Sequence, residues 1–400
     1  MYINKNRTRD ERKDNVHCNS AFKLTFMAGI YIHIPFCKTR CTYCDFFTKT
    51  NFSLQENLLN AMCREIEQRK DYLREPVETI YFGGGTPSVL PITDVKTILN
   101  TCFFSFTVNP DAEITLEANP DDLSHDYLEQ LREAGINRLS MGVQSFDDEQ
   151  LKAVKRRHSA TEAVQSIEWA HKAGFENISI DLIFGLPGQS LQSWKAQVDK
   201  AVSLDVQHLS AYGLTYETGT PLWYQMKAGT IVPTDEETMI EMYEYLIKTC
   251  ESNLFEQYEI SNFARNGLHS RHNSSYWKQI PYVGIGPAAH SFDGDSRQWN
   301  VSSIEKYIRH FHDGTPCFEK ELLTVQDKYN DFVMVSLRTM KGINLPLLEN
   351  LYGKEYLNHF VKSSKKFLEN NKLRINDDYL RLTPDGVMIS DSIIMELFVS

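Results

Sequence analysis

The chain has 400 residues, of which 42% are hydrophobic, 24% charged and 12% aromatic, and this profile excludes a disordered or fibrous protein. Its length is sufficient for two or three domains. Lysine and arginine total 42 against 53 aspartates and glutamates, so the formal net charge is −11, which argues against broad electrostatic binding to nucleic acid or anionic lipid.

The first segment, residues 1–27, is predicted to be a disordered arm. It is polar, mixes both charge signs and lacks the apolar stretch of a signal peptide. The chain also has no apolar run near the roughly 20 residues that span a bilayer. We therefore expect a cytoplasmic protein, whose eight cysteines are thiols or metal ligands rather than disulfides.

The core domain is expected at residues 28–310, where apolar, β-branched runs alternate with polar loops and amphipathic stretches. The predicted strands are 30–34, 79–82, 113–117, 138–142, 177–183 and 208–212. The predicted helices between them include 126–133, 160–173 and 191–202. This alternation predicts an α/β fold with a parallel sheet, and six units favour a partial (β/α)6 barrel over an eightfold one.

The rest of the chain has a different pattern. Residues 234–250 predict a helix that opens with a capping box of Thr234 and Glu237, and a glycine- and aromatic-rich segment follows. Residues 311–400 predict a small C-terminal α+β domain, winged-helix-like, with helices at 329–340 and 354–370 and a hairpin at 373–382. Since no strongly basic recognition helix is present, we expect this domain to pack or to bind a partner rather than DNA.

The strongest chemical signal is the cysteine motif CKTRCTYC, which contains Cys37, Cys41 and Cys44. Three thiolates at this spacing can converge on one soft metal centre. A structural zinc usually takes four ligands in two separated pairs, and no fourth ligand is near. Three cysteines on a [4Fe-4S] cluster leave one iron open and therefore reactive. A zinc site or a chance group of buried cysteines is the alternative.

Polar residues or glycines follow the predicted strands. They include Gly83 to Thr86, Glu117, Gln144 and Asp181. In a parallel barrel the carboxyl ends of the strands form one mouth, so these groups are expected to meet there. Glycines allow a ligand to approach the backbone closely. Taken singly, the glycines could form only a tight turn, and the carboxylates could be helix caps or solvated charges.

The CxxxCxxC motif after a strand, with Tyr43 before its last cysteine, resembles the radical S-adenosylmethionine superfamily. This resemblance implies a [4Fe-4S] cluster whose open iron chelates the amino and carboxylate groups of S-adenosylmethionine. The segments ITLEANP, LSMGVQSF and ISIDLIFGLPGQ are similar to the oxygen-independent coproporphyrinogen III oxidases and their relatives. Carried over, the contacts to the cluster-bound S-adenosylmethionine would be Tyr31, Tyr43, Gly84 and Glu117. The positions that match a second S-adenosylmethionine site are Gly85, Thr86, Gln144, Arg156 and Asp181.

The branch of this family is indicated by two further features. The oxidases typically carry another cysteine two residues after the third ligand, where this chain has Phe46, and they have a longer segment before the first strand. In contrast, the HNxxYW motif from His272 to Trp277, after YEISNFA, is similar to the HemW-type heme chaperones. Those relatives bind heme and pass it to target proteins. We therefore expect a heme chaperone, with oxidative decarboxylation of coproporphyrinogen III as the alternative activity.

The heme candidates are His272, Tyr276, Trp277 and His290. Neutral imidazole ligates heme iron, and aromatic rings stack on a porphyrin. For His272, the residues alone favour a hydrogen-bonded structural role over binding of heme iron. For His290, a buried core position fits the residues about as well as a heme role does. Expected partners are heme or a porphyrin and unidentified heme-receiving proteins, while transient membrane contact stays open. An RNA-modifying radical enzyme, which the acidic charge disfavours, and a zinc-containing interaction protein are further alternatives.

Overall fold

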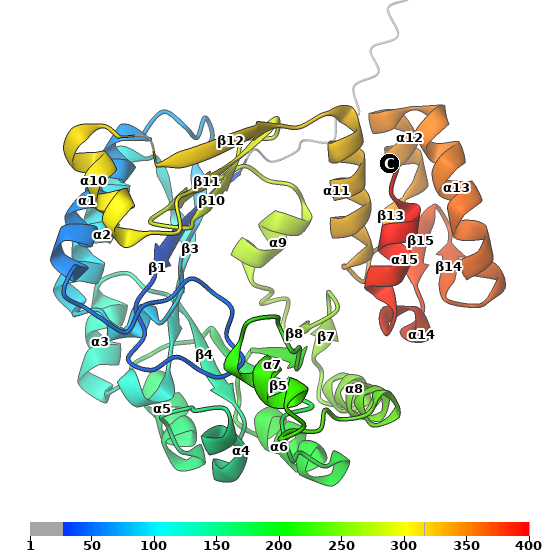
Figure 1. Ribbon diagram of the computed structural model, residues 1–400, viewed down its shortest axis with the longest axis horizontal. Helices are drawn as coiled ribbons and strands as arrows, with labels where there is room; N and C mark the ends of the chain where they lie inside the picture. Colours follow the sequence, from blue (N-terminus) through cyan, green and yellow to red (C-terminus); the bar gives the residue numbers. More distant parts are fainter. Residues whose placement is uncertain (1–26, 316, 400) are drawn as a thin grey trace, which may run out of the picture.

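The computed structural model describes residues 27–315 and 317–399 (Figure 1). The chain forms a large α/β part and a smaller C-terminal part. Nearly all of the expected arm at 1–27 lies outside the described residues. No helix within the described ranges combines the length and the apolar character that crossing a bilayer requires.

The predicted parallel sheet is confirmed. Its strands pair in chain order, and their bounds are β1 (Ala28–Ile34), β2 (Val77–Gly84), β3 (Val108–Ala118), β4 (Arg138–Gln144), β5 (Ile178–Phe184) and β6 (His208–Gly213). The helices around it are α1 (Gln55–Gln68), α2 (Ile92–Ser105), α3 (His125–Glu133), α4 (Asp148–Ala153), α5 (Ala160–Lys172) and α6 (Leu191–Ser203). Figure 1 shows these helices along the outside of the curved sheet.

Both edges of the sheet extend beyond the six predicted strands. β9 (Tyr282–Ile285) is a further parallel strand beside β1. Antiparallel strands continue this edge, namely β10 (His290–Phe292), β11 (Ser296–Asn300) and β12 (Phe318–Leu322). The other edge adds β8 (Asn262–Ala264) and β7 (Glu256–Gln257). Among the residues that the structure describes, the sheet therefore has 12 strands with β12 and β7 at its ends, and the barrel is partial, as expected.

The two faces of the barrel strands differ in chemistry. Residues that point outward are apolar and buried against the helices, as Ile32, Leu116 and Ile180 are. Residues at the alternate positions point into the barrel and include charged side chains such as Glu117 and Arg138. The apolar core therefore lies between the sheet and its helices, which leaves the barrel interior free for polar groups.

Helix α8 (Glu236–Ser252) begins differently from the prediction. The Asp235 carboxylate caps the helix by accepting a hydrogen bond from the backbone N–H of Thr238. The capping box predicted for Thr234 and Glu237 was therefore wrong, because the neighbouring aspartate occupies the N-cap position and Asp is among the best residues there.

The junction with the C-terminal part lies after β12. Helix α10 (Ile304–Asp313) packs on α1, and β12 pairs with β11, so the large sheet continues to Leu322 rather than ending at the expected 310/311 boundary. The elements that follow are α11 (Val325–Leu337), β13 (Ile343–Asn344), α12 (Leu345–Tyr352), α13 (Lys354–Glu369), β14 (Leu373–Asn376), β15 (Tyr379–Leu382), α14 (Pro384–Val387) and α15 (Ser390–Leu397). They share a separate apolar core that includes Tyr329, Phe360 and Ile393.

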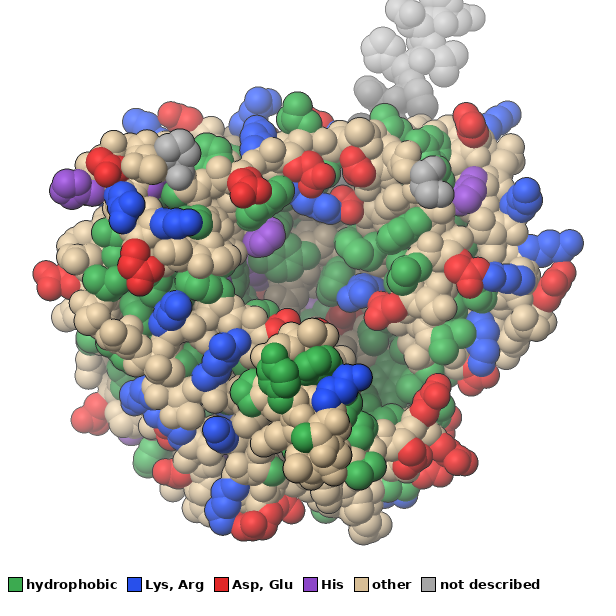
Figure 2. All heavy atoms as spheres, in the orientation of Figure 1, with side chains coloured by type: hydrophobic (Ala, Val, Ile, Leu, Met, Phe, Trp, Pro, Cys, Tyr) green, Lys and Arg blue, Asp and Glu red, His purple; other side chains and the backbone are tan. Residues whose placement is uncertain are grey.

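Two further short helices are α7 (Pro221–Lys227), whose first turn bonds to the loop after β1, and α9 (Arg271–Trp277). Helix α9 contacts β1 and β2 of the barrel and α11 of the C-terminal part. Figure 2 shows that the face in view is hollowed between the barrel and the C-terminal part, with hydrophobic side chains on both sides of the hollow.

Candidate functional site

The cysteine loop follows β1 and is fixed by backbone hydrogen bonds. The N–H of Cys37 donates to the carbonyl of Lys49 at 3.0 Å, and that of Thr42 donates to Val154 at 3.2 Å. The N–H of Leu222 at the start of α7 donates to the carbonyl of Thr42 at 3.0 Å. Backbone hydrogen bonds therefore hold the loop that presents the three thiols from several sides.

The three sulfur atoms are spread too widely for one zinc ion. Cys37, Cys41 and Cys44 are free thiols, and their sulfurs do not all lie within 4.8 Å of one another. A single tetrahedral zinc holds sulfur at about 2.3 Å, so two sulfurs on one zinc are at most about 4.6 Å apart. In a [4Fe-4S] cluster each cysteine binds a different iron, which allows wider spacing. The donor set therefore fits an iron–sulfur cluster better than a single ion.

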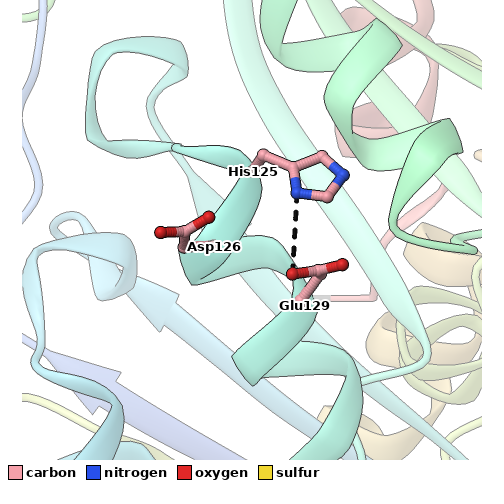
Figure 3. Close-up of side chains that lie close together, drawn as sticks. All are labelled: His125, Asp126 and Glu129. Atoms are coloured by element: carbon pink, nitrogen blue, oxygen red, sulfur yellow. Dashed lines mark ion pairs between the residues drawn. The ribbon is translucent and has the colours of Figure 1, made fainter.

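Within residues 27–315 and 317–399, one group brings three metal-binding side chains within 4.8 Å of one another, and it is His125, Asp126 and Glu129 on α3 (Figure 3). The Nδ1 atom of His125 lies 3.6 Å from Glu129 Oε2, one helical turn away. Asp126 and Glu129 are exposed, and His125 is half-buried. The group is a surface ion pair of a kind common on helices, and none of its three residues lines the cavity beside the cysteine loop.

A cavity of about 570 Å³ opens at the carboxyl ends of the strands beside the cysteine loop. The structure brings almost all of the predicted cluster and S-adenosylmethionine residues to its wall, namely Cys37, Cys41, Tyr43, Cys44, Gly84, Gly85, Thr86, Glu117, Gln144, Arg156 and Asp181. We call this cavity the mouth. The wall also contains Asn119, Ser140 and Tyr212, which the sequence analysis did not single out. Asn119 and Tyr212 lie at the ends of β3 and β6, a position that could have indicated them, whereas Ser140 lies within β4.

The glycine turn after β2 packs directly against the cysteine loop. A Cβ atom on Gly85 would lie 2.7 Å from the carbonyl oxygen of Phe36 and 3.1 Å from Cys37 Sγ. Gly84 has a φ of +104°, and a Cβ there would lie 2.6 Å from the ring of His33. The Thr86 hydroxyl donates to Cys37 Sγ at 3.3 Å. Glycine is thus required at both positions, and the turn and the loop form one unit.

Two carboxyl groups at the mouth are poised near neutrality. Glu117 accepts a hydrogen bond from the Tyr81 hydroxyl at 2.8 Å, and burial raises the pKa of Glu117 to about 7. Asp181 accepts one from the Ser140 hydroxyl at 3.4 Å, and burial raises the pKa of Asp181 to about 6. Both groups can therefore change charge near physiological pH, which is typical of functional sites.

Arg156 joins the cluster loop to the strand ends. Its Nη1 donates to Cys41 Sγ at 3.6 Å, and its Nη2 donates to Asn119 Oδ1 at 2.5 Å and to the carbonyl of Gly142. Gln144 ends β4 at an irregularity in the β4–β5 register, with a φ of 65°. Such a bulge re-aims the side chain of a strand end. The mouth thus contains a half-buried cation among carboxylates, thiols and amides.

Tyr31 does not line the mouth. Its hydroxyl lies 3.3 Å from His33 Nδ1, and its ring stacks on the rings of Tyr81 and His272 at centroid distances of 6.2 Å each. Tyr31 therefore lies inside the barrel, next to the Tyr81 side chain that contacts Glu117.

The HNxxYW motif forms α9, and its histidine is buried. The side chain of His272 is about 1% exposed. Its Nδ1 lies 2.7 Å from Thr79 Oγ1 and its Nε2 lies 2.8 Å from the Tyr276 hydroxyl. Burial lowers the pKa of His272 to about 3. In this arrangement both ring nitrogens are engaged, so the geometry matches the structural alternative and offers no nitrogen to a heme iron.

The motif also lies at the opposite end of the strands from the mouth. His272 contacts Thr79 near the start of β2, whereas Gly84 ends that strand at the mouth. Five residues of strand correspond to about 16 Å. Tyr276 packs edge-on against Tyr282 at 4.8 Å. The buried indole Nε1 of Trp277 has no hydrogen-bond partner among the residues that the structure describes.

His290 is placed differently from His272. It lies on β10, is exposed, and stacks on Trp299 with ring centroids 6.2 Å apart. Its ring makes no hydrogen bond to any part of the protein that the structure describes. Partial burial and the charge of Arg297 lower the pKa of His290. The buried core position considered for His290 is therefore wrong, because its side chain is exposed.

Comparison with known families defines the class of protein first. The Radical SAM superfamily matches residues 31–201, which contain the cysteine loop and most of the mouth. The HemN C-terminal domain matches residues 323–389, which begin just after β12. The coproporphyrinogen III oxidase (HemN) from Escherichia coli has a similar solved structure, with a TM-score of 0.81, 22% identity and coverage of 94% of this chain and 90% of that one. The expected radical S-adenosylmethionine fold is thus confirmed.

The particular family follows from curated relatives. The chain is 35% identical to the "Heme chaperone HemW" of Bacillus subtilis (strain 168), over 92% of this chain and 98% of that protein. It is 33% identical to the protein of the same name from Lactococcus lactis subsp. lactis (strain IL1403), over 86% of this chain and 92% of that protein. The chain belongs to the HemW heme chaperone family, which confirms the resemblance found in the sequence.

Proposed function

We propose that this protein is a heme chaperone that holds a [4Fe-4S] cluster and S-adenosylmethionine at the barrel mouth, binds heme, and delivers it to other proteins. The observation that carries the proposal is the gathering of three thiols, a glycine turn and two carboxyl groups around one cavity in a member of the HemW family. The heme-receiving proteins are unidentified. The proposal places the protein in the cytoplasm, with transient contact to a membrane.

The cluster would be held by Cys37, Cys41 and Cys44. When bound, it supplies an electron for one-electron chemistry on S-adenosylmethionine. The protein's own contribution is charge stabilisation at the sulfur atoms. The Thr86 hydroxyl and the Arg156 guanidinium donate to Cys37 and Cys41 respectively, and such donors favour the thiolate form.

S-adenosylmethionine would be held by the backbone of Gly84 and by Tyr43 and Glu117, with Tyr31 supporting this layer from inside the barrel. The glycine turn permits close backbone approach, and the Glu117 carboxylate can accept hydrogen bonds from N–H or O–H donors of the ligand. A second molecule of S-adenosylmethionine would be held by the positions that match the second site of the oxidases, which are Gly85, Thr86, Gln144, Arg156 and Asp181. Because the cluster-side and second-site residues share one cavity wall, two ligands would lie next to each other.

The HNxxYW helix would serve heme by closing and supporting its site rather than by ligating iron. His272, Tyr276 and the barrel strands form one buried polar and aromatic unit. Of the heme candidates named from the sequence, His290 is the one whose imidazole is exposed. Heme would therefore meet the protein outside the barrel interior, away from the buried histidine.

The alternative activity is that of an oxygen-independent coproporphyrinogen III oxidase. Phe46, which stands where the oxidases carry a further cysteine, lines the mouth and is 63% exposed. An apolar ring at the rim cannot supply a thiol there. This feature supports the chaperone proposal over the oxidase alternative.

The proposal is tested on the anaerobically reconstituted full chain. Iron and acid-labile sulfide analysis should give about four of each per chain, because a [4Fe-4S] cluster contains both. Hemin titration should then show saturable binding of about one heme per chain, and heme should pass to a heme-free acceptor protein. Zinc without acid-labile sulfide, or no saturable heme binding, would contradict the proposal.

A further inference from the structure

One edge of the sheet carries an aromatic surface that the mouth does not use. His290 on β10 pairs with Trp299 on β11, and Phe292 pairs with both Arg297 on β11 and Tyr282 on β9. Directly paired residues of antiparallel strands project from the same face of a sheet. Tyr282, His290, Phe292 and Trp299 therefore share one face, which we call the aromatic wall.

The aromatic wall is turned toward the barrel opening and the C-terminal part. Tyr282 packs edge-on against Tyr276 of α9, which fixes the side of the sheet on which the wall lies. Arg297, on the same face, forms an ion pair with Asp331 of α11. Strands β10 and β11, helix α9 and helix α11 surround the hollow visible in Figure 2, and hydrophobic side chains gather along it. The wall thus borders the hollow between the two parts.

The wall contains the groups that recognise three parts of an iron porphyrin. His290 has an exposed imidazole, and an uncharged imidazole is the form that binds iron. Trp299 and Phe292 are partly exposed, and aromatic rings pack on a planar macrocycle. Arg297 is 39% exposed in its side chain, and a guanidinium has five N–H donors, so donors remain beside its pair with Asp331.

We propose that the aromatic wall is the heme site, with His290 as an axial ligand of the iron, Trp299 and Phe292 against the porphyrin, and Arg297 on a propionate. This inference rests on the proposed chaperone function and adds the location of its cargo. Glu321 pairs with Arg297 from β12 and repels carboxylates, so the propionate would approach Arg297 from the Phe292 side. The His272 ring lies inside the barrel and supports the wall only through Tyr276 and Tyr282.

The ligand assignment is tested by hemin titration of the full chain carrying His290→Ala. We expect at least a tenfold loss of heme affinity and loss of the absorption and electron paramagnetic resonance signature of imidazole-ligated ferric heme. The matched control is His312→Ala, because His312 is also exposed but lies at the end of α10. Both variants replace exposed side chains, so their folding is checked by circular dichroism. Wild-type affinity and an unchanged spectrum in His290→Ala would overturn the assignment.

The propionate contact is tested separately with hemin and its dimethyl ester, which lacks both carboxylates. The wild-type chain should bind hemin more tightly than the ester, and Arg297→Gln should lose most of that preference. Asp331→Asn is the control, because it breaks the same ion pair while keeping the guanidinium, and it should retain or increase the preference. An unchanged preference in Arg297→Gln would overturn the proposed contact.

These outcomes separate the two proposals. If the wild-type chain binds no heme, both the chaperone function and the aromatic-wall site fail. If it binds heme but His290→Ala and Arg297→Gln bind hemin and its ester as the wild type does, the wall is not the site while the chaperone function stands.

Discussion

The mouth and the HNxxYW helix both place functional side chains beside the same strands, at opposite ends, but they differ in whether those side chains are free to bind a ligand. At the mouth, Glu117 and Asp181 border a cavity of about 570 Å³, and their pKa values lie near neutrality. At the other end, His272 is about 1% exposed and hydrogen-bonded through both ring nitrogens. The same strands thus carry a reactive end and a closed end.

The difference shows that a sequence motif can identify a protein family without identifying the residue that binds the heme iron. The side chain of His272 has the right chemistry for heme iron, but its hydrogen bonds to Thr79 and Tyr276 must break before it could bind. Leaving two buried hydroxyl groups without partners would cost several kcal/mol. Binding of iron by His290 would not carry this free-energy cost, because its ring is exposed.

The largest effect should come from removing a cysteine of the mouth. Cys41→Ala should reduce the iron and acid-labile sulfide of the reconstituted protein to less than about a tenth of the wild-type content, because a cluster with two thiolate ligands is poorly held. Cys63→Ala is the matched control, since Cys63 is a half-buried thiol on α1 outside the motif, and it should keep the full content. Equal iron content in both variants would remove the cysteine loop as the cluster site.

The next largest effect should come from adding one methyl group to the glycine turn. Gly85→Ala places a Cβ 2.7 Å from a carbonyl oxygen of the cysteine loop and should weaken S-adenosylmethionine binding by about a hundredfold, since overpacking costs about 1–3 kcal/mol. Gly174→Ala is the control, because its Cβ meets nothing within 4 Å although its φ is +84°. The control should lose about 1 kcal/mol of stability and keep its ligand affinity. Equilibrium dialysis under anaerobic conditions measures the S-adenosylmethionine affinity of both variants. Equal affinities would contradict the claim that this turn binds the ligand.

Substitution of His272, at the closed end of the strands, should lower the stability of the protein and leave its heme affinity nearly unchanged. His272→Ala should lower the free energy of unfolding by about 2 kcal/mol, because the hydroxyl groups of Thr79 and Tyr276 lose their partner. Heme affinity should stay within about threefold of the wild type. His272→Asn can keep one of the two hydrogen bonds and should lose less stability. A heme affinity that falls tenfold or more at unchanged stability, in urea unfolding and hemin titration, would make His272 a ligand after all.

The smallest effect concerns pH. Burial raises the pKa of Glu117 to about 7, so its ionised, hydrogen-bond-accepting form is lost as the pH falls through 7. S-adenosylmethionine binding should therefore weaken by up to about tenfold from pH 8 to pH 6. The groups that face Glu117 are Tyr81 and Tyr31, which stay neutral in this range, the carboxyl of Asp181, and the cation of Arg138.

The matched variant for this pH dependence is Glu117→Gln. It keeps the size of the side chain but cannot ionise, so its binding should be weaker and nearly flat over the same range. A residual slope centred near pH 6 would assign the effect to Asp181, whose pKa is raised to about 6 by burial. A wild-type affinity that does not change between pH 6 and pH 8 would contradict a role for either carboxylate in binding.

Much of the fold and mouth could be predicted because the information is local. Each barrel strand is a short apolar run with a polar or glycine-rich end, and the carboxyl ends of parallel strands meet at one edge. The sequence predicts on this ground that Glu117 and Asp181 meet, and both line the mouth. It also predicts close backbone approach at Gly84 and Gly85, and a Cβ on either would collide with a neighbour.

The parts that the sequence did not predict depend on distant contacts. Strand β9 has four residues and becomes recognisable only beside β1, about 250 positions earlier in the chain. His272 is buried by Thr79, 193 residues before it, and the seven residues of α9 are too few for a clear periodicity. The sheet continues to Leu322 because β12 pairs with β11. The pattern of residues 318–322 alone does not reveal that pairing.

The central claim, that the mouth belongs to a heme chaperone and not to a porphyrin-decarboxylating oxidase, is tested most directly by one anaerobic assay. The reconstituted protein is incubated with S-adenosylmethionine, a strong reductant and coproporphyrinogen III, and the products are examined for protoporphyrinogen IX. We predict no conversion by a preparation that contains a full cluster and binds hemin. Stoichiometric or greater conversion would contradict the account and would make the chain an oxidase despite Phe46.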